Sequence, residues 1–468
     1  MKLLIGLIAA LFIFSLSSLN WRRTLKVVFF LIVIEGALRK WVLPQANEIL
    51  YFLKDLVLLG AYFNFYCFSG KREKFPNKGY VINILIFLVL IWCVFQLFNP
   101  SLGSPVAGLL GLRGYLLYIP LIWMVPLLFQ SEEELHKFLR RYFLLVIPVG
   151  LIGIIQFFSP ATSFINAYSN ENSVVTATFG AMSSVRITGT FSYISGYAIY
   201  LIVSFGILIS LFSIPQPVEW KVISVVELFL VVVNSFMTGS RSVIFAQILF
   251  IVCYVAVRGI RQPARTLLFM SRLIVPTLVI AIAAYIWFRP AIDAFVLRTT
   301  SNKDVPARIT GSFQEPIDFL QYKQLDGYGT GATHQAAPLL RKALDLPPGE
   351  VIPVYVEPEM GRILLELGPI GFLFWYGLRV SILIALISNF WHLERPLLRQ
   401  LALAAFLIQA IQINGHLVFH HTFSVYYWFL SSFVFLLPRL QQIENWQREQ
   451  QFMQEYDLSP YFPDSSYR

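Results

Sequence analysis

The sequence of 468 residues has little charge and few cysteines. Only 13% of its residues are charged, whereas a soluble globular protein carries roughly 25%, and 57% are hydrophobic. So few charges exclude a water-exposed globular surface and indicate a polytopic membrane protein. The three cysteines, Cys67, Cys93 and Cys253, all lie inside apolar runs. The sequence therefore shows neither a disulfide framework nor a cysteine-based metal site.

Motifs of nucleotide-dependent and metal-dependent enzymes are also missing. The glycine-rich run GYGTG at 327–331 lacks the Gly-Lys-Ser/Thr of a P-loop, and no strand-to-helix unit surrounds it. No Asp-x-Asp motif stands in the segments expected outside the membrane. His416, His420 and His421 are close in sequence, but a zinc site would need a further ligand, usually a carboxylate. We therefore expect no metal and no cofactor, and interpret these histidines as a polar wall or an acceptor contact.

The net charge of +10 could suggest a nucleic-acid partner. In a membrane protein, however, Lys and Arg collect in the cytoplasmic loops, and this explanation suffices here. We expect no nucleic-acid partner.

Long apolar runs predict the fold. About thirteen of them approach the roughly 20 residues that cross a bilayer. They predict an all-α polytopic membrane protein with about twelve or thirteen transmembrane helices, forming one integral membrane domain over residues 1–468. The runs lie at 2–18, 25–39, 48–69, 79–98, 113–129, 142–159, 192–213, 219–237, 242–258, 267–288, 362–389, 399–415 and 422–438.

Basic residues predict the orientation. If the helices alternate in direction, most Lys and Arg fall on one side, which the positive-inside rule places in the cytoplasm. Two longer segments, 160–190 and 289–361, are then external loops, and the second is the largest soluble piece. The basic segments are 21–26, 71–78, 136–141, 258–272 and 394–399, together with a cytoplasmic tail at 439–468.

Four arginines are predicted at the outer face, namely Arg113, Arg186, Arg241 and Arg308. Arginine is unusual in outward turns, and several at one depth indicate an anionic ligand, because guanidinium groups bind phosphate oxygens as a fork. Each could instead lie at a helix end with its head group in water, or pair with a carboxylate. Arg241 follows Gly239-Ser240, where backbone N–H groups at a helix start would add attraction for phosphate.

Acidic residues mark the point where the second loop re-enters the membrane. Glu359, Arg362 and Glu366 share one helical face, and a capped helix start would explain Glu366. A chemical role is at least as consistent with the position of Glu357, which faces the same outer plane as the arginines.

Charged residues also lie within the N-terminal apolar runs. Glu35 and Arg39 are four residues apart, and Lys54-Asp55 sits early in the third run. Charges at such depth are costly and normally pair inside the bundle. We interpret them as an internal ion network bracing the N-terminal helices, with a conduit lining as the alternative.

The order of three motifs resembles that of the O-antigen ligase and Wzy-type polymerase family. The motifs are FMTGSRSVIFAQ (236–247), LDGYGTG (325–331) and ILLELGPIG (363–371), and the similarity covers about residues 180–440. The segments 35–55 and 111–120 are similar to a branch of exopolysaccharide polymerases. The resemblance implies a fold like that of C-type glycosyltransferases. It also implies transfer of a glycan from an undecaprenyl diphosphate carrier to an acceptor sugar, at the outer face of the bacterial inner membrane.

The same resemblance implies roles for individual residues. Arg241 matches the Ser-Arg at the start of a helix and Arg308 matches an arginine of the outer loop, which implies catalytic roles for both. The glycines 327, 329 and 331 match the family's glycine-rich turn. The family carries His-Asn eleven residues before the glycine of Glu-Leu-Gly, where this chain has Glu357 and Pro358. Glu357 is therefore the implied base, with Glu359 as its competitor. The implied substrate-binding side chains are Arg113, Arg186, His334, Glu359 and Arg362, besides Gly327, Gly329 and Gly331.

The implied partners are a lipid-linked oligosaccharide, an acceptor glycan, membrane lipid, and polysaccharide export or chain-length proteins. Two other functions stay open on the sequence. One is a transporter of a lipid-linked sugar or small anion, which would also have about a dozen helices and buried charges. The other is a non-catalytic subunit of a polysaccharide export system.

Overall fold

The computed structural model describes residues 2–68, 80–168, 176–179, 184–301, 305–323 and 325–455. The basic segment at 71–78 lies outside them. Each of the apolar runs coincides with helical structure, which confirms the predicted all-α architecture. Within the described ranges, ten helical segments are long and apolar enough to cross a membrane, and Gly6–Ser17 and Pro396–Ile411 are shorter apolar helices. The protein is thus a multi-pass helical membrane protein.

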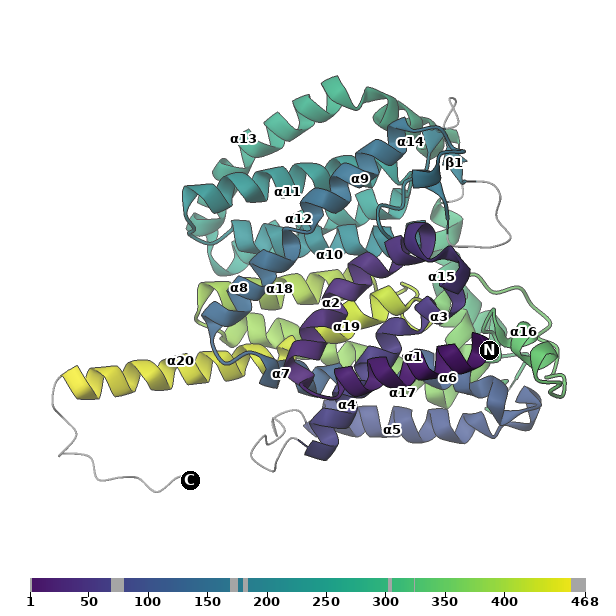
Figure 1. The fold of residues 1–468 in the computed structure, drawn as a ribbon. Helices are drawn as coiled ribbons and strands as arrows, with labels where there is room; N and C mark the ends of the chain where they lie inside the picture. The colour runs from purple at the N-terminus through teal and green to yellow at the C-terminus, as the bar shows by residue number, and fades with distance from the viewer. Residues whose placement is uncertain are drawn as a thin grey trace.

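The chain forms helices almost throughout (Figure 1). The first half contains α1 (Lys2–Ser17), α2 (Trp21–Ala37), α3 (Asn47–Tyr51), α4 (Leu53–Phe68), α5 (Tyr80–Leu97), α6 (Pro105–Leu116), α7 (Leu121–Leu128), α8 (Glu132–Phe143), α9 (Val146–Phe158), α10 (Ile194–Phe212) and α11 (Val218–Met237). The second half contains α12 (Arg241–Arg261), α13 (Pro263–Trp287), α14 (Arg289–Ser301), α15 (Val305–Phe319), α16 (Ala337–Ala343), α17 (Glu359–His392), α18 (Pro396–Ile411), α19 (His421–Ser431) and α20 (Phe433–Glu455). Short 3-10 or π turns are η1 (Leu38–Val42), η2 (Pro44–Ala46), η3 (Pro100–Leu102) and η4 (Phe164–Asn166).

Helix α10 lies at the centre of the bundle. It is apolar on all sides and almost entirely buried, as expected of a helix enclosed by other helices. It packs against α11, α12, α18 and α19, while α17 packs against α5, α15 and α18. Helix α13 is the opposite case, because most of its large apolar side chains are exposed. That face suits contact with lipid.

The basic segments that the structure describes gather at one end of the bundle, which we call the basic end. Lys26 Nζ lies 3.1 Å from Glu134 Oε1, and Arg395 pairs with Glu132 and, at 3.3 Å, with Glu444. These pairs join α2, α8, α20 and the turn before α18, as predicted from the charge distribution. In Figure 1, α8 and the far end of α20 mark this end, whereas β1, α15 and α16 lie at the other, the site end.

The described parts of the two predicted external loops lie at the site end and contain regular structure. Residues 289–361 include α14, α15 and α16, which pack against α11, α17 and α6 respectively. The segment 160–190 contains a small antiparallel pair of strands, β1 (Thr178–Phe179) and β2 (Ser184–Val185). Length and polarity indicated segments outside the membrane, but they did not reveal these elements. At the basic end, the predicted tail begins inside α20, which stays helical to Glu455.

A break in α17 positions the glycine-rich turn. Gly368 has a φ of 68°, and Pro369 lacks the N–H that would bond the carbonyl of Leu365. The turn supplies the replacement, since Tyr328 N donates to Leu365 O at 2.6 Å and Gly329 N donates to Glu366 O at 3.0 Å. A proline-broken membrane helix is tolerated where neighbouring groups satisfy its backbone in this way.

Candidate functional site

A cavity of about 690 Å³ lies at the site end, between α10, α12, α14 and the loop from Ile411 to His420. The wall of this cavity towards the site end, which we call its upper part, carries Arg186, Arg241 and Arg298. Two of the four arginines predicted to converge, Arg186 and Arg241, thus line one cavity, although they come from different parts of the chain. Arg298, on α14, was not predicted, although it lies in the same predicted external segment as Arg308.

The sequence around Arg241 fixes the position of its side chain. Gly239 adopts a φ of 62°, and the backbone then enters α12 with Ser240 as its N-cap residue. A side chain at Gly239 would meet the ring of Phe179 at 2.9 Å, so the close approach of β1 requires glycine. Arg241 is thus the first residue of α12, where the helix dipole and unpaired N–H groups favour an anion.

Arg186 is held in place by the backbone before that helix. Its Nε donates to the carbonyl of Thr238 at 3.0 Å. Burial lowers the pKa of Arg186, and repulsion from Arg298 lowers it further. Two guanidinium groups placed so that they repel each other create a strong local preference for a bound anion.

Below the arginines, the cavity has an apolar wall. From α10 it includes Ile194, Ala198 and Ile202, each one turn further along the helix, and from α12 it includes Phe245 and Leu249. Eight helical residues extend for about 12 Å, so the wall follows two turns of α10 into the membrane-spanning region. The cavity therefore combines a cationic upper part with an apolar lower part.

The loop before α19 adds polar groups to this cavity, namely Gln412, Asn414, His416 and His420. His420 Nε2 lies 2.9 Å from the hydroxyl of Ser195, and its Nδ1 accepts a bond from Phe423 N at 3.4 Å. Burial lowers the pKa of His420 to about 4, so its imidazole is neutral at pH 7. Neutral imidazole can accept a proton from a hydroxyl group.

A second cavity, of about 280 Å³, lies beside the first, and Tyr193 and His420 line both. Its wall includes Glu35, Arg39 and Lys54. Lys54 Nζ lies 2.8 Å from Glu35 Oε2, and Arg39 Nη1 lies 3.6 Å from Glu35 Oε1. The predicted ion network of the N-terminal helices is present, and it also lines a cavity.

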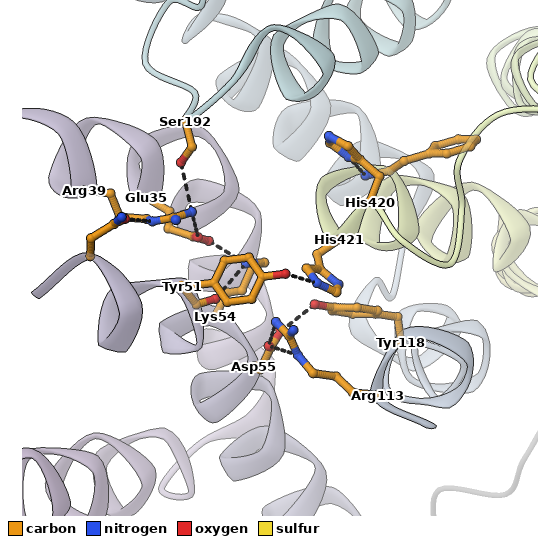
Figure 2. A network of polar contacts seen from close by, with 12 residues as sticks. Glu35, Arg39, Tyr51, Lys54, Asp55, Arg113, Tyr118, Ser192, His420 and His421 are labelled. Atoms are coloured by element: carbon orange, nitrogen blue, oxygen red, sulfur yellow. Dashed lines mark hydrogen bonds and ion pairs between the residues drawn. The ribbon is translucent and has the colours of Figure 1, made fainter. Parts of the chain in front are cut away.

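Figure 2 shows Tyr51 at the middle of this network. Its hydroxyl lies 2.5 Å from Nε2 of His421, while Arg39, Lys54 and Arg113 surround its ring, the last with its guanidinium 4.6 Å from the ring centroid. Three cations face two carboxylates here, those of Glu35 and Asp55, so one positive charge is in excess.

Arg113 does not line the arginine cavity. Its Nε donates to Asp55 Oδ2 at 2.7 Å, its Nη2 also bonds that oxygen, and the hydroxyl of Tyr118 donates to Asp55 Oδ1 at 2.5 Å (Figure 2). Arg113 therefore pairs with a carboxylate, which is the alternative that the sequence left open for each of the four arginines. A carboxylate 58 residues away in the chain pairs with it, which the sequence did not reveal.

The three glycines of the 327–331 turn serve close packing. Their φ values are 64°, 94° and 82°, in the region that favours glycine. A Cβ on Gly327 would lie 2.6 Å from Gly368 N, and one on Gly331 would lie 2.7 Å from Gly111 N. The turn thus fits between α5, α6 and α17, and its glycines do not line either cavity.

Glu359 and Glu366 are fully buried anchors of α17. Glu359 Oε2 accepts the backbone N–H of Val418 at 2.9 Å, and Glu359 Oε1 lies 3.5 Å from Arg379. Glu366 accepts bonds from Tyr115 and Thr333. These contacts hold both buried carboxylates in place, which favours structural roles for them.

Glu357 is exposed two residues before α17 and interacts electrostatically with His416, which lines the arginine cavity. Partial removal from water and the nearby Arg362 lower the pKa of His416, and Glu357 opposes both. The Arg362 guanidinium donates to Val356 O at 3.1 Å and lies 5.2 Å from the ring centroid of Phe419.

His334 and Arg308 complete the set of predicted residues. His334 packs its ring against Phe419, and burial, together with Arg113 and Arg362, lowers its pKa to about 4. Phe419 lines the second cavity, so His334 and Arg362 stand behind that wall. Arg308 lies in α15, but its side chain is outside the described part of the structure.

In comparisons with known proteins, no family model and no curated protein sequence matches the chain. Within the described residues, no group of three or more His, Cys, Asp or Glu side chains is placed to hold a metal ion. The fold and the site define a multi-pass helical membrane protein with an arginine-lined cavity at one end of its bundle.

Proposed function

We propose that this protein is a membrane glycosyltransferase of the O-antigen ligase and polysaccharide polymerase kind, with a fold like that of C-type glycosyltransferases. Its donor is a glycan on undecaprenyl diphosphate, and its acceptor is a sugar hydroxyl. The observation that carries the proposal is the cavity in which Arg186, Arg241 and Arg298 stand above an apolar wall. A lipid diphosphate has the same two parts, an anionic head and an apolar chain.

The arginines support the chemistry of the leaving group. When the sugar–phosphate bond breaks, negative charge develops on the departing diphosphate. Guanidinium groups already in place, in a poorly hydrated cavity, stabilise that charge without reorganisation. The first-turn N–H groups of α12 beside Arg241 add to this stabilisation. The mechanism needs neither a metal ion nor a nucleotide sugar.

The acceptor hydroxyl needs a base, which we place at Glu357 and His416. His416 lines the cavity, and Glu357 interacts with it from the exposed side. A carboxylate beside a neutral imidazole can orient the ring and stabilise the imidazolium that forms when the ring takes a proton. In this arrangement Glu357 acts through His416, while the neighbouring Glu359 holds the loop in position.

The proposal includes a location for the site. The basic segments that are described gather at the opposite end, and by the positive-inside rule this supports a cavity at the outer face of a bacterial inner membrane. The substrates would then be lipid-linked glycans already moved across that membrane.

The direct test is glycan transfer by the purified, reconstituted protein. We expect incubation with an undecaprenyl-diphosphate oligosaccharide and an acceptor glycan to produce longer glycans and to release undecaprenyl diphosphate. The Arg298→Lys variant should lose transfer. Arg289→Lys is the matched control, because Arg289 is an exposed arginine on the same α14. Movement of intact lipid-linked substrate across the vesicle, with no new glycosidic bond, would instead identify a transporter and overturn the proposal.

A further inference from the structure

Four arginines lie close together at the basic end, far from the cavity of the proposed reaction. Arg258 and Arg261 end α12, Arg265 lies in the first turn of α13, and Arg399 lies in the first turn of α18. Arg258, Arg261 and Arg265 each repel the guanidinium of Arg399 electrostatically. These positions form what we call the arginine cluster.

No carboxylate in the described ranges forms an ion pair with this cluster. At this end Glu132 and Glu444 both pair with Arg395, and no ion pair within the described ranges joins Glu394 to the cluster. Four positive charges at short range are therefore not neutralised by the described part of the protein.

Two of these arginines are also removed from water. Arg258 is 6% exposed and Arg399 is 5% exposed. Nε and Nη1 of Arg258 and Nε of Arg399 have no hydrogen-bond partner within the described structure. Buried cations without counter-charge are costly, and their mutual repulsion adds to that cost. An anion bound at the cluster would remove both penalties.

The remaining contacts hold the cluster in shape. Arg258 lies 4.5 Å from the ring centroid of Phe269, Arg261 donates to the carbonyls of Phe390 and Leu393, and Arg399 Nη2 donates to Gln262 Oε1 at 3.1 Å. Arg265 is exposed and Arg261 is partly exposed. An anion can therefore contact these two directly, while the buried pair attracts it from beneath.

The surface beside the cluster is apolar. Ile260 is 75% exposed, and Leu267, Ile274 and Val275 on α13 are each more than 60% exposed. A soluble anion would make no favourable contact with that apolar surface, whereas the acyl chains of a lipid would cover it. Basic pockets between membrane helices are a known way of binding acidic lipid head groups.

We propose that the arginine cluster at the basic end binds the phosphate head group of an anionic membrane phospholipid. The site is independent of the glycosyl-transfer cavity and does not rest on the function proposed for it. The bound phosphate would sit between α12, α13 and α18, and would neutralise the cluster.

Thermal unfolding of the delipidated full-length protein in neutral detergent tests this proposal. We expect diphosphatidylglycerol to raise the unfolding midpoint by about 2 °C or more. Phosphatidylethanolamine at the same concentration should have little effect, and so should inorganic phosphate. Equal shifts with inorganic phosphate would show that the site binds a free anion, and would overturn the proposal of a lipid ligand. Equal shifts with phosphatidylethanolamine, or no shift at all, would overturn the site.

Variants separate ligand binding from a structural role. Without lipid, Arg399→Gln should be as stable as the unsubstituted protein or more stable, because a buried like charge is removed. With diphosphatidylglycerol, its shift should fall to half or less. A purely structural arginine would instead give a less stable variant under both conditions.

A second variant protects the test against misfolding of Arg399→Gln. Arg265→Gln changes an exposed residue and should bind the lipid roughly fivefold more weakly, as measured by lipid titration. Lys137→Gln is the control, since Lys137 is an exposed cation of the same end, paired with Glu133. Full retention of the lipid shift in Arg265→Gln would overturn the proposal.

Discussion

Glu366 and Thr333 are joined by two hydrogen bonds, although 33 residues separate them in the chain. Oε1 of the fully buried Glu366 accepts the backbone N–H of Thr333 at 2.9 Å and its hydroxyl at 2.7 Å. The other oxygen accepts the hydroxyl of Tyr115 at 2.9 Å. This carboxylate therefore connects α6, the glycine-rich turn and the broken α17.

The first prediction concerns that connection. Glu366→Ala leaves the Thr333 donors and the Tyr115 hydroxyl without their acceptor inside the protein. Each unsatisfied buried group costs about 1–3 kcal/mol, so the variant should unfold at a lower temperature and accumulate less in membranes. Glu357→Gln, an exposed change two residues before the same helix, is the stability control. An unchanged unfolding midpoint for Glu366→Ala would mean that the carboxylate does not anchor the turn.

The second prediction concerns the cavity arginines. Arg241→Lys should be nearly as damaging to transfer as Arg241→Ala, because an ammonium group cannot reproduce the two parallel hydrogen bonds of a guanidinium to a diphosphate. Loss of one preplaced donor typically costs about 10²-fold or more in turnover. Membrane abundance must be measured beside activity, since a misfolded variant would also be inactive. If Arg241→Lys kept near-full glycan output, Arg241 would act only as a positive charge at the start of a helix, and not as a bidentate ligand of the diphosphate.

The third prediction concerns the base. Glu357→Gln keeps the size of the side chain but removes its basicity, and should lower turnover about 10²-fold or more. Binding of the lipid diphosphate should survive, because the arginines are intact. His416→Gln should give the same pattern. Glu359→Gln should instead lower abundance, because the carboxylate of Glu359 holds Val418 and Arg379.

The comparison of these variants identifies the base. A well-folded Glu359→Gln that alone loses activity would move the base to Glu359. Activity retained in both glutamate variants would remove the carboxylate from the mechanism.

The fourth prediction concerns pH. Burial lowers the pKa values of His334 and His420 to about 4, from about 6.5 in an unfolded chain. Between these values the unfolded chain binds protons that the folded protein does not. Stability is therefore fully present above pH 6.5 and falls as the pH drops toward 4, by up to about 3 kcal/mol for each histidine. Unfolding midpoints measured from pH 7.5 to pH 4.5 should show this slope.

Substitution of one histidine checks the origin of the pH effect. His420→Gln should flatten part of the slope, whereas His392→Gln, at an exposed position, should leave it unchanged. An identical slope in His420→Gln would assign the acid sensitivity to other groups.

The fifth prediction concerns orientation. In a variant without native cysteines, Tyr355→Cys reports on the site end, where Tyr355 is 88% exposed, and Glu394→Cys reports on the basic end. A membrane-impermeant maleimide should label only Tyr355→Cys in cells with an intact inner membrane. Labelling of Glu394→Cys alone would place the cavity on the cytoplasmic side. That result would contradict the proposed reaction, whose lipid-linked donor is on the outer side.

Local patterns determined much of the architecture. An apolar run of membrane-spanning length forms a helix whatever surrounds it, because its backbone must bond internally in lipid, and each run is helical here. Lys and Arg cannot easily cross the bilayer, so the basic segments that are described gather at one end. The same reasoning placed Arg186 and Arg241 at the other end, and both line the cavity.

Tertiary packing alone decided the partners of individual side chains. Arg113 looked equivalent to Arg241 in sequence, yet Asp55 pairs with it, while Arg298 joins the cavity instead. The glycine-rich turn matched a family motif in sequence, and packing brings it to the carbonyls of Leu365 and Glu366 at the Gly368–Pro369 break in α17. The physical reason is range. Hydropathy and charge act through each segment's own contact with lipid and water, whereas hydrogen bonds and ion pairs depend on which distant segments the helix packing brings within about 3 Å.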